Sequence, residues 1–122
     1  MCDQLHEITT LILRDKRISY FDDNFEDIDK EGNRLKLVDL CNIECLMASH
    51  NMISDLTGIL QLTTLVELNL SYNLLPDVVG IEELSQLKSL QLNHNKISMI
   101  DSLPKLLNLK QLGLFHNEVS DP

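Results

Sequence analysis

The residues LVELNLSYNLL, at 65–75, place leucine at the first, fourth, sixth and eleventh positions and asparagine at the ninth. Further copies of this pattern open at Ile43, Leu87 and Leu109, so that four copies follow one another at a spacing of 22 residues. A fixed period of this length indicates a repeat architecture, in which each unit packs against its neighbours. Positions are numbered below from the opening residue of each copy.

The first half of each copy predicts a strand that ends in a turn. Apolar residues at positions 4 and 6 alternate as in a strand with one buried face. A buried asparagine at position 9 needs hydrogen-bond partners, and its short amide both donates and accepts. We therefore expect Asn51, Asn73, Asn95 and Asn117 to bond the backbone where the strands end and to form a ladder through the stack.

The second half of each copy predicts a short helical return. Apolar residues recur at positions 14, 17 and 20, as in Val78, Ile81 and Leu84, and a spacing of three suits a 3₁₀ or α turn. Strands stacked about 4.8 Å apart are narrower than the bulky returns, so the stack should curve. The sequence predicts an α/β solenoid with a parallel sheet on its concave face and 3₁₀/α returns on its convex face.

These in-phase copies resemble the leucine-rich-repeat family over residues 8–122. The repeat length, and the asparagine followed by a short apolar return, resemble the intracellular subclass named for a regulatory subunit of protein phosphatase 1. The resemblance implies a non-enzymatic protein–protein interaction module or scaffold, in a cytoskeletal, ciliary or centrosomal complex. It also implies two alternatives, a regulatory or targeting subunit of a protein phosphatase and a nuclear adaptor for histones or splicing.

The chain is expected to form one domain over residues 1–122. Its expected units are an irregular first repeat at 8–42 with an insertion at 22–34, complete repeats at 43–64, 65–86 and 87–108, and a partial repeat at 109–122. Insertions in solenoids map to loops, so the acidic insertion should form an exposed loop or add a helical turn over the first repeat. Leu37 and Leu40 match return positions 17 and 20.

The insertion also contains part of a calcium-binding pattern. Residues 27–32, DIDKEG, resemble the first half of an EF-hand loop. The second half requires an apolar residue and a bidentate glutamate where this chain has Arg34 and Val38. We therefore expect no metal or other cofactor.

Both ends of the array depart from the pattern. The first copy has Lys16 in place of asparagine, with Arg14 and Arg17 beside it. Such charges blunt an edge strand against pairing with another chain, and a basic contact patch is the alternative. The last copy reaches Pro122 without a capping pattern, which favours a chain that continues further; the alternative is a short cap that ends in Asp121 and Pro122.

The composition of the chain limits which classes of partner and which cellular compartment are expected. A net charge of −9 disfavours nucleic acid, which requires clustered cations. The N-terminus shows no signal-peptide pattern and the chain has no apolar run of about 20 residues, so we expect no membrane association. The odd number of cysteines, Cys2, Cys41 and Cys45, favours a reducing compartment. We expect a cytoplasmic protein, with the cytoskeleton, cilium or centrosome preferred over the nucleus.

The predicted binding surface is the concave face, formed by positions 3, 5, 7 and 8. The candidate partner-binding residues are Met47, His50, Glu67, Asn69, Tyr72, Gln91, Asn93, His94, Phe115 and His116. Tyr72 and Phe115 are the expected anchors, since aromatic side chains carry much of the energy of protein interfaces.

Three histidines share position 8 with Tyr72, and this stripe raises two further possibilities. A metal site would need ligands that the stripe does not supply, whereas a pH-sensitive contact surface would use histidine titration near neutrality. Catalysis by Cys45 with His50 is not expected, because the strand rise separates them by roughly 15 Å. We expect no catalytic residues and a protein partner.

Overall fold

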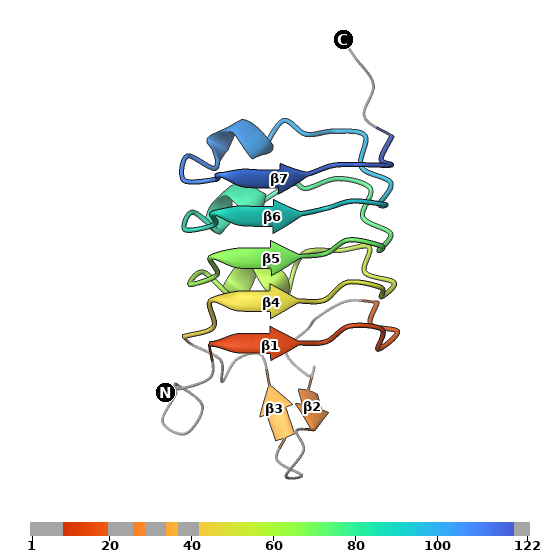
Figure 1. The fold of residues 1–122 in the computed structure, drawn as a ribbon, viewed down its shortest axis with the longest axis vertical. Coiled ribbons are helices and arrows are strands. Elements are labelled where there is room, and N and C mark those ends of the chain that lie inside the picture. Colours follow the sequence, from red (N-terminus) through yellow and green to blue (C-terminus); the bar gives the residue numbers. More distant parts are fainter. Residues whose placement is uncertain (1–8, 20–25, 29–33, 37–41, 119–122) are drawn as a thin grey trace.

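The computed structural model describes residues 9–19, 26–28, 34–36 and 42–118. Five short strands form one parallel sheet in the order β1-β4-β5-β6-β7, as Figure 1 shows. Their bounds are β1 Thr10–Ile12, β4 Cys45–Met47, β5 Glu67–Asn69, β6 Ser89–Gln91 and β7 Gln111–Gly113. We call the copies that contain these strands rungs 1 to 5, in that order.

The register of the sheet follows the repeat. Leu46 pairs with Leu68, and Leu68 pairs with Leu90, so each rung lies in phase with the next. Leu11 pairs with Leu46 in the same manner, although 35 residues separate the two. The longer connection between rungs 1 and 2 therefore leaves the strand register unchanged.

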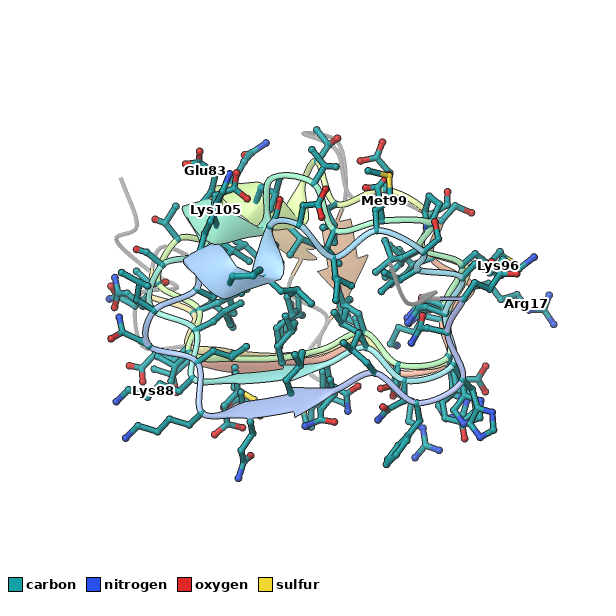
Figure 2. The ribbon with its side chains drawn as sticks, turned by 90° about the horizontal axis from the view of Figure 1, so that it is seen from above. Arg17, Glu83, Lys88, Lys96, Met99 and Lys105 are labelled. Atoms are coloured by element: carbon teal, nitrogen blue, oxygen red, sulfur yellow. The ribbon has the colours of Figure 1, made fainter. Side chains whose placement is uncertain are left out.

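Short 3₁₀ turns form the opposite side of the solenoid. They are η2 Ile59–Gln61, η3 Ile81–Glu83 and η4 Leu103–Lys105, and Figure 2 shows them across the core from the sheet. Their first residues are buried in all three rungs. The predicted parallel sheet with short helical returns is confirmed.

One apolar core fills the space between the sheet and the returns. It consists of leucine, isoleucine and valine side chains with one alanine, Ala48. Position 4 shows how the core changes along the stack, because Leu46 and Leu90 are fully buried whereas Leu112 is 43% exposed. Inner rungs are covered on both sides by neighbouring rungs, and this mutual cover is the source of solenoid stability.

The asparagine ladder lies where the strands end. The Asn73 side chain donates to the carbonyl oxygens of Leu70 in its own rung and Ala48 in the preceding rung, at 2.9 and 3.1 Å. Its side-chain oxygen accepts from the N–H of Ile53, also in the preceding rung, at 2.9 Å. Asn51, Asn95 and Asn117 repeat this arrangement. The predicted ladder is present, and every asparagine reaches back toward the rung before it.

A second, small sheet lies at the β1 end of the stack (Figure 1). β2 Glu26–Ile28 and β3 Arg34–Lys36 pair in antiparallel fashion, with Asp27 opposite Leu35. The described parts of the insertion are thus strands, where the sequence suggested a loop or a helical turn. The remainder of the calcium-like segment, and the return residues Leu37 and Leu40, lie outside the described residues.

No helix in the described part of the chain is long and apolar enough to cross a bilayer.

Candidate functional site: the sheet face and its adjoining turn

The outward side chains of the strands form a surface that we call the sheet face, made by positions 3, 5 and 7 of the rungs. Met47, Glu67, Asn69 and Gln91 lie on β4, β5 and β6 as the sequence predicts. Asn93 and Phe115, at position 7, lie just beyond the strands. Phe115 is 73% exposed, so most of its ring contacts solvent.

Position 8 differs from the expected strand geometry. It lies in a turn, and the backbone there is left-handed, with φ of 57° at His50, 60° at Tyr72, 58° at His94 and 54° at His116. This conformation is uncommon for residues with a side chain, and especially for bulky ones. Hydrogen bonds to the following rung hold this conformation. The N–H of Tyr72 donates to the carbonyl oxygen of Asn93 at 2.8 Å. In the same way, the N–H groups of His50 and His94 donate to the carbonyl oxygens of Ser71 and Phe115.

The left-handed turns align four rings into a continuous column, which we call the histidine–tyrosine stack: His50, Tyr72, His94 and His116. Neighbouring ring centroids are 4.3, 4.2 and 4.2 Å apart, with interplanar angles of 10°, 10° and 21°. These separations are close to the rung spacing, so the stack follows directly from the repeat. Tyr72 is nonetheless 46% exposed, which leaves part of its ring available to a partner.

Several polar groups of the sheet face bond to one another. The Asn93 side chain accepts from the N–H of Phe115 at 2.8 Å and donates to the Gln91 side chain at 3.3 Å. Both side chains lie over Gly113, where an added Cβ would come within 2.3 Å of the Gln91 oxygen. The Asn69 side chain accepts from the N–H of Ser71 at 3.0 Å. Asn69 and Asn93 are therefore partly exposed to a partner and also hold the backbone and side chains of the face by hydrogen bonds. The repeat pattern alone does not reveal this second role.

A hollow of about 430 Å³ joins the sheet face to the histidine–tyrosine stack. Its lining consists of Arg14, Ser49, His50, Asn69, Ser71, Tyr72, Asn93, His94 and Phe115. It brings together six of the ten predicted residues. Met47, Glu67, Gln91 and His116 are not in this lining, although His116 extends the stack by one ring.

Comparison with known proteins bears on the fold. No protein-family model and no curated protein sequence matches the chain. Among solved structures, the chain is similar to an internalin (inlF) from Listeria monocytogenes, at 26% identity and a TM-score of 0.72. The match covers 96% of this chain and 31% of the internalin chain, so this chain spans less than a third of that protein. The chain is a leucine-rich-repeat solenoid.

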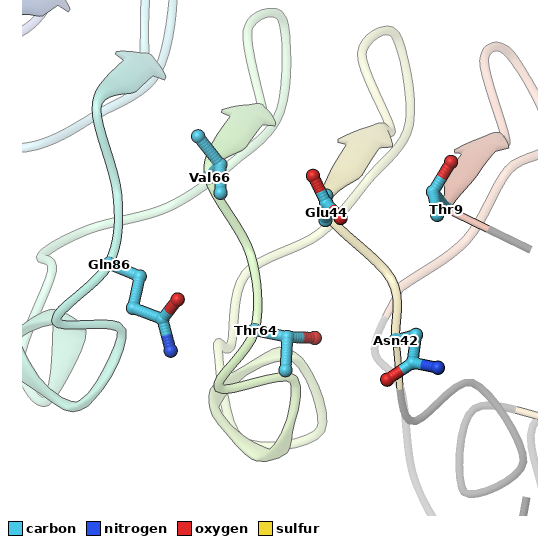
Figure 3. Close-up of a pocket in the computed structure, with 6 residues that line it drawn as sticks. All are labelled: Thr9, Asn42, Glu44, Thr64, Val66 and Gln86. Carbon is cyan, nitrogen blue, oxygen red and sulfur yellow. The ribbon is translucent and has the colours of Figure 1, made fainter. Parts of the chain in front are cut away.

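A leucine-rich-repeat solenoid has a second side surface, where the chain enters each strand. A hollow of about 420 Å³ lies there, lined by Thr9, Asn42, Glu44, Thr64, Val66 and Gln86, and Figure 3 shows these residues. The Thr64 hydroxyl bonds to the carbonyl oxygen of Ile43, and the Gln86 amide bonds to that of Thr63 at 3.4 Å. These two side chains each bond to backbone that lies about one repeat earlier in the chain. Among the described lining residues, Glu44 is the one that carries a carboxylate.

The ionisable groups of this leucine-rich-repeat sheet include the thiol of Cys45, on β4. Burial raises the pKa of the Cys45 thiol, and the nearby Glu67 carboxylate raises it further by its charge and by accepting a hydrogen bond at 3.8 Å. A raised pKa lowers the fraction of thiolate, the nucleophilic form. Within the described ranges, no three histidine, cysteine, aspartate or glutamate side chains gather as metal ligands. The fold typically serves as a non-enzymatic binding scaffold.

Proposed function

We propose that this solenoid binds a protein partner through the sheet face and the histidine–tyrosine stack. The observation that carries the proposal is the exposure of two aromatic rings around one hollow, with Phe115 73% and Tyr72 46% exposed. Large rings cost little conformational entropy to fix and often anchor protein interfaces. The leucine-rich-repeat fold supports a protein-interaction role in general terms.

The backbone under the hollow supports this role. Tyr72 and Phe115 belong to rungs 3 and 5, and every strand between them is paired on both sides. The N–H groups of Tyr72 and Phe115 are both hydrogen-bonded, to the carbonyl of Asn93 and to its side chain. A partner would therefore meet rings whose backbone is already fixed, which reduces the ordering cost of binding.

The finer part of the proposal concerns the complex in which this scaffold works. The length and composition of the repeat resemble those of the intracellular subclass, which supports a cytoplasmic scaffold in a cytoskeletal, ciliary or centrosomal assembly. A regulatory or targeting role with a protein phosphatase is the alternative from the same resemblance. Phosphatase activity that copurifies with the tagged chain, and is lost when the sheet face is altered, would favour the alternative.

The test is an affinity capture with quantitative mass spectrometry on three matched baits. The baits are the unaltered chain, a variant with Tyr72→Ala and Phe115→Ala, and a control with Val79→Ala and Leu107→Ala. Val79 and Leu107 are also exposed apolar residues, at 68% and 89%, but they belong to the return side of the solenoid. Thermal unfolding of all three baits establishes that each is folded.

We expect a set of proteins to be captured equally by the unaltered bait and by the control. The sheet-face variant should capture the same proteins at least about tenfold less, because loss of an interface anchor costs about 2 kcal/mol or more. Equal capture by the sheet-face variant would show that partners bind elsewhere. If only the control captured fewer partner proteins, the binding surface would lie on the return side of the solenoid instead.

A further inference from the structure

Position 10 of each rung forms a second exposed line, beside the histidine–tyrosine stack and separated from it by the buried asparagines. In rungs 1 to 4 its residues are Arg17, Met52, Leu74 and Lys96, all of which are exposed. We call this line the edge strip. Figure 2 shows Arg17 and Lys96 pointing outward from the same lateral side of the solenoid.

The backbone holds the edge strip in line. In rungs 2 to 4 the N–H of the position-10 residue donates to the carbonyl oxygen of position 11 in the preceding rung. Met52 bonds to Ile18 at 2.8 Å, and Lys96 bonds to Leu75 at 3.0 Å. These bonds keep the side chains one rung apart, and strands are spaced at about 4.8 Å, so Arg17 and Lys96 are separated by about 14 Å along the stack.

The chemistry of the edge strip is apolar in the middle and cationic at both ends. Met52 is 43% exposed and Leu74 is 44% exposed, so nearly half of each apolar side chain contacts water. Arg17 and Lys96 flank them in a chain whose net charge is −9. A basic–apolar–basic order on an acidic protein is a local feature that its overall charge does not produce, and electrostatic complementarity selects partners of the opposite sign.

Two described carboxylates lie beside the cations at the ends of the edge strip. Asp15 lies two residues before Arg17, and Glu118 occupies position 10 of rung 5, one rung beyond Lys96. Asp55 and Asp77 follow three positions later, where each accepts a hydrogen bond from a backbone N–H of its own turn, at 2.7 and 3.1 Å. The middle of the strip, from rung 2 to rung 3, carries no charge at position 10.

From this order of side chains we infer that the edge strip is a second docking surface, which binds an extended acidic segment of a partner protein. In an extended chain, residues i, i+2 and i+4 share one face and span about 14 Å. Carboxylates at i and i+4 would thus reach Arg17 and Lys96 while an apolar residue at i+2 covers Met52 and Leu74. The surface is separate from the hollow of the proposed function, so each stands or fails independently.

The probe is a capped synthetic peptide of sequence Gly-Glu-Ser-Leu-Ser-Glu-Gly, titrated to millimolar concentration into the ¹⁵N-labelled chain. A peptide with the same composition but adjacent glutamates, Gly-Ser-Leu-Glu-Glu-Ser-Gly, controls for charge alone. We expect the first peptide to shift the amide resonances of Arg17, Met52, Leu74 and Lys96 most, and the second to shift them little. Added salt should weaken the binding, because the ion pairs are exposed.

Matched variants locate the site. Arg17→Glu with Lys96→Glu should weaken binding of the first peptide about tenfold, since each exposed ion pair becomes a repulsion. Lys88→Glu with Lys110→Glu makes the same change in net charge at position 2, on the other lateral side of the solenoid. It should leave the affinity within about twofold, because the added charge lies on the opposite side of the solenoid (Figure 2) and salt screens interactions between distant exposed charges.

Three results would overturn the inference. They are the absence of shifts at millimolar peptide, equal shifts from the two peptides, and largest shifts on the sheet face near Gln91 and Phe115. The four charged positions are exposed, so the variants should remain folded, and their amide spectra check this directly. The inferred peptide site does not include Tyr72 or Phe115. Failure of the peptide to bind would therefore not contradict the proposed function, and failure of the capture experiment would not contradict the edge strip as a docking surface.

Discussion

The Asn95 side chain donates a hydrogen bond to the carbonyl oxygen of Leu70 at 2.9 Å and accepts one from the N–H of Leu75 at 3.0 Å. Leu70 and Leu75 belong to rung 3, whereas Asn95 belongs to rung 4. One buried amide therefore joins two rungs, at a place where the chain leaves the strand and the sheet no longer supplies partners.

Replacement of Asn95 by alanine should lower the free energy of unfolding by about 2–3 kcal/mol, because the buried Leu75 N–H loses its acceptor. Urea denaturation followed by circular dichroism measures this change. The control is Asn108→Ala, since Asn108 is exposed and its side chain bonds to the Ser85 carbonyl oxygen at the protein surface, at 3.1 Å. Its cost should stay below about 0.5 kcal/mol, and equal costs for the two variants would contradict the ladder's role.

Gly80 and Gly58 occupy the same repeat position with different backbones. Gly80 has φ of 92°, and an added Cβ would lie 2.8 Å from the Leu60 side chain. Gly58 has φ of −70°, which alanine adopts readily. We expect Gly80→Ala to cost about 1–2 kcal/mol and Gly58→Ala to cost less, as measured by thermal unfolding. The reverse order would show that side-chain space outweighs backbone conformation here.

Asp55 should give a small dependence of stability on pH. Hydrogen bonds from the Thr57 hydroxyl and N–H lower the pKa of the Asp55 carboxyl. A group with a lowered folded pKa stabilises the fold above its unfolded pKa, and this contribution is lost as the pH falls through the folded value. Because Asp55 is exposed, the contribution should be a few tenths of a kcal/mol.

Asp55→Ala tests this expectation by thermal unfolding at neutral and strongly acidic pH. The variant should be slightly less stable than the unaltered chain at neutral pH, and the difference should shrink in acid. A difference that is independent of pH would mean that the turn needs the side chain's shape and not its charge.

The Cys45 thiol should react slowly with a disulfide reagent at neutral pH. Its pKa is raised by burial and by Glu67, so little thiolate is present. Glu67→Gln removes the charge and should accelerate the reaction, whereas Glu44→Gln, on the strand-entry side, should not. Stopped-flow absorbance in a background with Cys2→Ser and Cys41→Ser isolates this thiol. An unchanged rate in the Glu67 variant would show that burial alone sets its reactivity.

The parts of the structure that follow from the sequence are those in which residue type determines the contact. Leu68 and Leu90 at position 4 are buried because leucine alternates with polar neighbours, and Asn73 bonds the backbone because a buried amide must. The 3₁₀ turn at Ile81–Glu83 follows from apolar residues at a spacing of three. Each of these relations recurs from copy to copy, so the sequence shows the same residue pattern several times.

The left-handed turn at position 8 could not be predicted in this way. Tyr72 and His94 carry no glycine-like signal, and their positive φ arises because their N–H groups meet a carbonyl oxygen of the next rung. The bond between Asn93 and Gln91 depends on side-chain rotamers. The pairing of Glu26–Ile28 with Arg34–Lys36 lies in a highly charged segment without the apolar alternation that marks a half-buried strand.

The backward reach of the asparagines bears on how such an array changes its length. Asn73 serves the turn of rung 2, Asn95 that of rung 3, and Asn117 that of rung 4. If a whole copy were duplicated between two rungs, the asparagine of the inserted copy would bond to the turn of the copy before it. The asparagine of the copy after it would bond to the turn of the inserted copy. Gain or loss of a whole 22-residue unit thus leaves every internal turn satisfied, whereas a partial duplication orphans one. The array can evolve in whole steps without redesign of its interior.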